Sequence, residues 1–174
     1  MTPHELKQVA ANVVERAIKS GADGVEVFVL DGNEFEGSIR QCEIEVLKVA
    51  GYRSISLRYL KEERAVATGA SDFSPASLDR LVSETAALVL LADPDPDNRL
   101  PASAQMASEA IDLDLFDPAI ERFPFEERIA AACEAERVAL AHDPRITASG
   151  GATYATVEDS SAFASSRGFS AATR

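Results

Sequence analysis

The sequence has few of the residues from which enzymes most often build a recognisable active site. Its 174 residues include two histidines, two cysteines and no tryptophan. His4 and His142 lie far apart in the sequence, as do Cys42 and Cys133, and no HExxH or CxxC motif occurs. A P-loop and a nucleophile elbow are also missing. The sequence therefore predicts no catalytic residue, no cofactor-binding residue and no metal ligand in this chain.

Positive charge is scarce as well. Lysine and arginine together number 17 against 29 acidic residues, which gives a formal net charge of −12. Such a chain repels nucleic-acid phosphates and anionic lipid surfaces. No run of lysine and arginine is interleaved with aromatic residues. We therefore expect no direct nucleic-acid binding and no membrane binding, and a solvated acidic surface explains the charge.

Long apolar segments are also missing. The first residues contain no apolar signal core, and the longest apolar run, residues 86–92, is far shorter than a membrane span. Because there is no leader and no CxxC pair, we interpret Cys42 and Cys133 as free thiols in a reducing compartment. Cys133, which lies among alanines, is interpreted as a core residue. These features predict a cytoplasmic location.

The apolar residues that are present, 46% of the chain, follow two periods. Helical spacing after the capping pattern Thr2–Glu5 predicts a helix over residues 3–20. From residue 24 to residue 70 the period is two, and the region is divided by a turn signal at 31–33, a break at Gly51 and a charged turn at 61–64. Together with a further strand that begins near Ile44, this gives roughly four or five strands. Consecutive strands joined by short turns must be antiparallel.

A second helix is predicted over residues 75–92 and a third from Pro124, with further strands after residue 145. The complete pattern predicts an α+β fold, in which helices pack on one face of a mainly antiparallel sheet. The stretch TGASDFSPASL at the start of the second helix could be a ligand-cradling turn or a corner. It has little glycine and no basic neighbour, so we interpret Ser74 as the N-cap and Pro75 as the first helical residue.

Two further groups invite a functional interpretation. Asp112, Asp114 and Asp117 resemble a calcium cluster, but the turn glycine and terminal glutamate of an EF-hand are missing at the required offsets, so a solvated loop is favoured. A hydrolase triad would require His4 or His142 to approach the serines of the C-terminal region, and we do not favour it. His4 is interpreted as a surface residue and His142 as a helix C-terminal cap.

Five segments, taken in their order along the chain, indicate a protein family as well as secondary structure. They are AIKSGADGVEVF at 17–28, GYRSISLRYL at 51–60, AVATGASDFSPASL at 65–78, DLDLFDP at 112–118 and SSRG at 165–168. Together they resemble the N-terminal domain of the TldD/PmbA family, the modulators of DNA gyrase, over nearly the whole chain. The DLDLFDP element makes the PmbA or TldE branch the more similar one.

This resemblance implies a cytoplasmic peptide-processing system in which two related subunits associate. A TldD-type subunit would carry an HExxxH zinc motif in its C-terminal half, and none of those ligands maps onto this chain, so zinc is expected only in that partner. Residues 1–174 would form a single N-terminal domain truncated from a longer two-domain protein. It would help form the groove for an extended peptide substrate, would not be catalytic alone, and would bind a TldD-type subunit or form a homo-dimer.

The alternative is a stand-alone protein–protein interaction or regulatory module with the same fold. Continuation of the reading frame beyond Arg174 into a second domain would favour the metallopeptidase-complex hypothesis, and a stop codon there would favour the module. Direct DNA binding, which the gyrase name suggests, is disfavoured by the net charge of −12.

Overall fold

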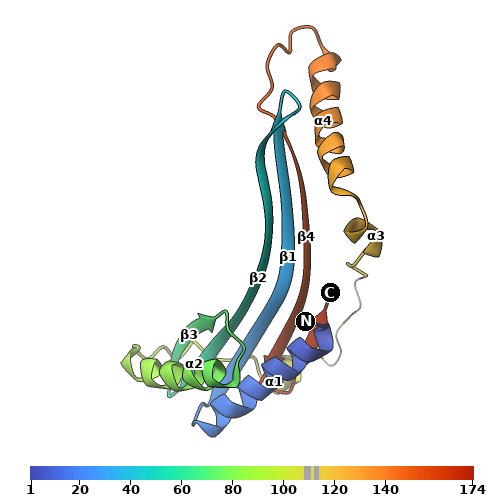
Figure 1. The fold of residues 1–174 in the computed structure, drawn as a ribbon. Coiled ribbons are helices and arrows are strands. Elements are labelled where there is room, and N and C mark those ends of the chain that lie inside the picture. The colour runs from blue at the N-terminus through green and yellow to red at the C-terminus, as the bar shows by residue number, and fades with distance from the viewer. Residues whose placement is uncertain (108–110, 112–113) are drawn as a thin grey trace. The chain divides into compact units, whose positions relative to one another are not determined.

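The computed structural model describes residues 1–107, 111 and 114–174 and contains one five-stranded antiparallel sheet with helices beside it (Figure 1). The strand order is β3-β2-β1-β4-β5. The strands are β1 (Gly24–Arg40), β2 (Glu43–Lys61), β3 (Arg64–Ala70), β4 (Ala152–Ser165) and β5 (Ser170–Thr173). The α-helices are α1 (Pro3–Lys19), α2 (Pro75–Leu88), α3 (Pro118–Glu121) and α4 (Phe125–His142), with 3-10 turns at Val89–Leu91 and Ser103–Gln105.

The chain divides into two compact units. Unit 1 comprises Met1–Asp31, Tyr52–Leu113 and Asp159–Arg174, and unit 2 comprises Gly32–Gly51 and Asp114–Glu158. Strands β1, β2 and β4 contribute residues to both units. Unit 1 holds α1 and α2, and unit 2 holds α3 and α4.

In unit 1, α1 and α2 cover the same face of the sheet. The strand residues of the core alternate along the chain, as a half-buried strand requires. One apolar cluster joins Val25, Val27 and Val29 of β1 and Ile55, Leu57 and Tyr59 of β2 to Leu6, Ala10, Val13 and Ala17 of α1 and Leu78, Leu81 and Val82 of α2. The predicted α+β fold is thus confirmed, and β2 and β3 pair antiparallel as expected, with Leu57 opposite Thr68.

The two helix starts follow the predicted pattern. Thr2 and Glu5 form the reciprocal capping box of α1. Ser74 caps α2 by accepting the Ser77 backbone N–H at 3.4 Å, and Pro75 is the first helical residue. The Asp72 carboxylate in turn accepts hydrogen bonds from the Ser74 backbone N–H and hydroxyl, each at 2.8 Å. The structural interpretation of Ser74 as a cap is therefore confirmed. The α-helical part of α2 ends at Leu88, earlier than the predicted residue 92.

The predicted turn at residues 31–33 and the predicted break at Gly51 are wrong, because both positions lie inside continuous strands. A Cβ placed on Gly51 would lie 3.2 Å from the Asn33 side-chain oxygen, so the two turn-like segments approach each other on neighbouring strands. Pairing between long strands overrides the local turn preference here. The chain instead turns between β1 and β2 at Gln41 and Cys42, which have left-handed φ angles of 52° and 59°.

Candidate functional site

The two histidines belong to different units and take part in local structure. His4 lies in the exposed first turn of α1, where its Nε2 atom is 2.9 Å from the Gln8 side-chain nitrogen. His142 is the last residue of α4, and Asp143 rather than His142 occupies the C-cap position. Within residues 1–107, 111 and 114–174, no three His, Cys, Asp or Glu side chains gather as a metal ion would require.

The acidic cluster falls partly outside the described residues, since Asp112 is not among them. Asp117 has a local role as the N-cap of α3, where its carboxylate accepts the Ala119 backbone N–H at 2.8 Å. None of the helices in the described part of the chain is long and apolar enough to cross a bilayer.

The interpretation of the two cysteines as free thiols is wrong for this structure, because Cys42 and Cys133 form a disulfide. The bond joins the β1–β2 turn to the middle of α4 across a sequence separation of 91 residues, and the two Cα atoms are 4.9 Å apart. Cα separations of this size are usual for disulfides. The sequence carries no sign of the bond, since only the packing of α4 beside the hairpin brings the two residues together.

Glu136 holds the same turn from the next turn of α4. It is 4% exposed, and its two carboxylate oxygens accept the backbone N–H groups of Gln41 and Cys42, each at 3.1 Å. The Gln41 N–H, together with the Ser149 hydroxyl and the Cys42 N–H, lowers the pKa of the Glu136 carboxyl below its ordinary value. Glutamate is seldom buried unless it is paired, so this residue fixes the turn to the helix. Its position in the charged run EAER gave no signal of this role.

The first turns of α4 are held on unit 2 by an aromatic cluster. The Phe35 ring of β1 contacts Phe125 edge-on, with ring centroids 5.7 Å apart, and also meets Tyr154 of β4 at 6.4 Å. The Arg128 guanidinium lies over the Phe35 ring at 5.0 Å. Gly37 permits the close approach of the helix, since a Cβ there would lie 2.6 Å from Cδ1 of Ile129.

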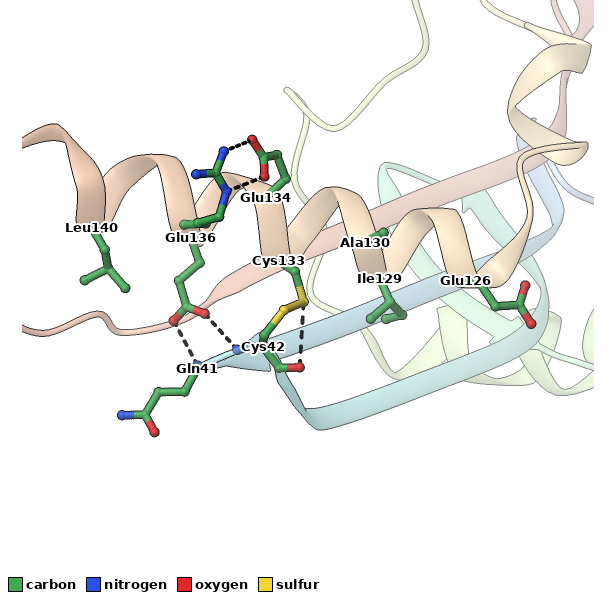
Figure 2. Close-up of a pocket in the computed structure, with 10 residues that line it drawn as sticks. Gln41, Cys42, Glu126, Ile129, Ala130, Cys133, Glu134, Glu136 and Leu140 are labelled. Atoms are coloured by element: carbon green, nitrogen blue, oxygen red, sulfur yellow. Dashed lines mark hydrogen bonds and ion pairs between the residues drawn. A yellow bond between two sulfur atoms is a disulfide. The ribbon is translucent and has the colours of Figure 1, made fainter.

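A groove of about 630 Å³ lies in unit 2 beside these contacts, between α4 and the β1–β2 turn (Figure 2). We call it the α4 groove. Its lining residues recur along one side of α4 at helical spacing and end on the turn. They are Glu126, Ile129, Ala130, Cys133, Glu134, Glu136, Arg137 and Leu140 of α4, with Gln41 and Cys42 of the turn. Half of these residues are charged or polar, but the surface that they present to the groove is mostly apolar, and the disulfide lies in its wall.

The first half of β2 forms an exposed edge of the sheet in unit 2. β3 pairs with β2 over Ile55–Lys61, and in the described part of the chain no strand pairs with residues 43–51 on the side away from β1. We call residues 43–51 the β2 edge. Large apolar side chains are exposed along it at Ile44, Val46, Leu47 and Val49, with exposed fractions from 47% to 76%. An unpaired strand edge with such side chains is suited to pairing with another extended chain.

Two curated proteins are similar to this chain in sequence. A protein of Escherichia coli O157:H7 named metalloprotease PmbA is 30% identical over 149 residues, which is 86% of this chain and 32% of the relative. A metalloprotease PmbA homolog of Haemophilus influenzae is 29% identical over 150 residues, 86% of this chain and 33% of the relative. The chain belongs to the PmbA/TldD/TldE family. It spans about one third of the length of these relatives, and no protein-family model matches it.

Solved structures of the family show the same fold. A modulator of DNA gyrase from Bacteroides thetaiotaomicron superposes with a TM-score of 0.85 at 20% identity, covering 97% of this chain and 38% of that one. TldE from Thermococcus kodakarensis superposes with a TM-score of 0.70 at 16% identity, covering 95% of this chain and 36% of that one. The DLDLFDP element indicated the PmbA or TldE branch, which agrees with the names PmbA and TldE of these proteins.

Proposed function

We propose that this chain is the N-terminal domain of a PmbA/TldE-like subunit in a cytoplasmic zinc metallopeptidase complex. In this proposal it helps to form the groove for an extended peptide and does not cleave the peptide itself. The observation that carries the proposal is the presence, in unit 2, of both the exposed β2 edge and the apolar α4 groove.

An extended peptide can use such a surface in two ways. Its backbone adds to an exposed strand through main-chain hydrogen bonds, which give affinity for any sequence, and alternate side chains enter apolar pockets, which give selectivity. The β2 edge is also charged: Lys48 pairs with Glu34 at 2.6 Å, and Arg40 pairs with Glu45 at 3.2 Å. Charges on an edge strand limit pairing between copies of the same chain, so they favour a dedicated partner over aggregation.

The metal that the relatives' name implies does not fit the residues described in this chain. Catalytic zinc takes three protein ligands and leaves one position open. The Cys42 and Cys133 sulfurs are bonded to each other, and each histidine belongs to a different unit. We therefore assign no metal-dependent step to this chain and place the zinc in a TldD-type partner. Association with that partner, or with a second copy of this chain, is part of the proposal.

A stand-alone protein–protein interaction module is the second candidate. The exposed β2 edge favours it equally, because any partner with a free strand can pair there. The two functions differ in what the surface does to peptide cleavage. A groove-forming domain changes how a partner enzyme binds its peptide, whereas an interaction module does not.

The experiment compares Val46→Lys on the β2 edge with Val138→Lys, a matched control. Val46 and Val138 are 47% and 54% exposed, and Val138 lies on α4 outside the groove lining. The protein carrying this chain is co-expressed with a TldD-type subunit of the same organism, and cleavage of a fluorogenic peptide library is measured. We expect Val46→Lys to raise KM about tenfold, since a charge would lie where a peptide side chain packs. Unchanged kinetics in Val46→Lys, with association intact, would contradict the groove and favour the interaction module.

A further inference from the structure

The disulfide lies where a small thiol can reach it. Both sulfur-bearing residues line the α4 groove, Cys42 is exposed, and Cys133 is partly exposed (Figure 2). Structural disulfides that resist reduction are usually removed from solvent, whereas exposed ones exchange with thiols. The position of the bond therefore makes it chemically accessible in the folded protein.

α4 holds the β1–β2 turn through two links that are one helical turn apart. Cys133 provides the covalent link to Cys42, and the Glu136 carboxylate provides hydrogen bonds to the Gln41 and Cys42 N–H groups. Both residues of the turn have left-handed φ angles that non-glycine residues rarely adopt, so contacts that hold this conformation stabilise the turn. If the disulfide opens, the Glu136 carboxylate still holds the turn to α4, because it accepts the Gln41 and Cys42 N–H groups.

The remainder of α4 is attached independently of the disulfide. The Phe35–Phe125 contact, the Arg128–Phe35 contact and the packing of Ile129 against Gly37 hold its first turns on unit 2. Opening the disulfide therefore leaves the helix in place at that end, whereas the turn at the other end keeps only the hydrogen bonds to Glu136. The wall of the groove would change while the fold remains.

We propose that Cys42 and Cys133 form a reversible thiol–disulfide latch that sets the position of the β1–β2 turn and hence the shape of the α4 groove. The proposal does not depend on what the groove binds. The co-reactant is a thiol–disulfide couple, either glutathione or a protein dithiol.

The exchange is balanced in both directions. A thiolate of the dithiol attacks one sulfur, a mixed disulfide forms, and the other cysteine leaves as a thiolate and takes up a proton. The second thiol of the dithiol then displaces the remaining cysteine. Two electrons and two protons pass to Cys42 and Cys133, and the dithiol becomes a disulfide. Oxidised glutathione closes the bond again: one cysteine thiolate forms a mixed disulfide with glutathione, the other cysteine displaces it, and two molecules of reduced glutathione leave.

The test uses the 174-residue chain in glutathione buffers of graded reduced-to-oxidised ratio, without denaturant. Free thiols are trapped by alkylation and counted by mass, and amide hydrogen exchange is measured in parallel. We expect both thiols to appear together in one reversible transition. Exchange at residues 41–43 should rise about tenfold in the reduced form, while residues 25–29 in the unit 1 core stay protected.

Two variants sharpen the test. Cys133→Ser should show the exchange of the reduced form in every buffer. Glu136→Gln should raise exchange at residues 41–43 modestly while the disulfide is closed, because the carboxylate accepts two of these N–H groups. The rise should be much larger once the disulfide is reduced, because the covalent link to α4 is then missing as well. The proposal is overturned by a bond that does not form at any ratio, by one that resists excess dithiothreitol, by equal exchange in both forms, or by loss of protection throughout unit 1 on reduction.

Discussion

Gly37→Ala tests the close approach of α4 to β1. The added Cβ would lie 2.6 Å from Cδ1 of Ile129 and 3.2 Å from Cζ of Phe35, whereas carbon atoms pack best at about 3.5–4.0 Å. Overpacking of this kind costs about 1–3 kcal/mol. Replacing glycine within a strand returns about 0.5–1 kcal/mol through the unfolded state. Because Cδ1 is the end of the partly buried Ile129 side chain and can move, the cost lies in the middle of its range, and we expect Gly37→Ala to lower the free energy of unfolding by about 1 kcal/mol.

A second substitution at Ile129 should relieve the clash. Ile129→Val removes the Cδ1 atom, and because Ile129 is only partly buried the single change should cost about 0.5 kcal/mol. The double variant should then be more stable than the sum of the two changes predicts, by about 1 kcal/mol. Urea denaturation followed by far-UV circular dichroism gives the three values. Gly150→Ala is the matched control and should be nearly neutral, since no atom lies within 4 Å of its Cβ position.

Additive effects of Gly37→Ala and Ile129→Val, within about 0.5 kcal/mol, would refute the reasoning. So would a Gly37→Ala variant that is no less stable than Gly150→Ala. Either result would mean that α4 does not rest on Gly37, and the described wall of the α4 groove would lose its support.

Three further tests concern Ser74, Glu136 and the metal content of the chain. Ser74→Ala should lower stability by about 1 kcal/mol in urea denaturation, whereas Ser74→Asn, which keeps a capping oxygen, should be nearly neutral; equal losses in both would argue against the cap. The folded state lowers the pKa of Glu136, so this carboxylate adds to the free energy of unfolding above its ordinary pKa of 4.5. That stabilisation is lost as the pH falls through the folded-state pKa. Glu136→Gln should therefore flatten the fall of the urea midpoint between neutral and acidic pH. An unchanged slope would mean that other carboxylates set the acid sensitivity. The dialysed chain should hold no stoichiometric zinc by elemental analysis and should not cleave fluorogenic peptides, and chelator-sensitive turnover would contradict the placement of zinc in a partner.

Local sequence chemistry accounts well for the elements of unit 1. The capping box at Thr2 and Glu5 and the Ser74–Pro75 pair mark helix starts through backbone hydrogen bonds made within a few residues. Alternating valines from residue 25 give the strand and its buried face. These signals act over short distances, so the sequence expresses them directly.

The candidate site depends on contacts that no local pattern reports. Cys42 meets Cys133, and Glu136 meets Gln41, only after α4 has packed beside a hairpin that lies more than ninety residues earlier in the chain. The turn signals at Gly32, Asn33 and Gly51 were misleading for the same reason, since pairing between neighbouring strands decides their conformation. The family resemblance indicated the fold and its context but none of these contacts.

The division of β1, β2 and β4 between two units has a consequence for how the protein can be dissected and how its hairpin can change in length. Unit 2 is assembled from Gly32–Gly51 and Asp114–Glu158, and the first of these is one excursion that leaves β1 and returns in the neighbouring β2. No single cut in the chain separates the units, so two separate deletions would be needed to remove unit 2. Lengthening or shortening that excursion in steps of two residues on each strand preserves the faces of both strands. The length of the hairpin can thus change while the core of unit 1 keeps its register.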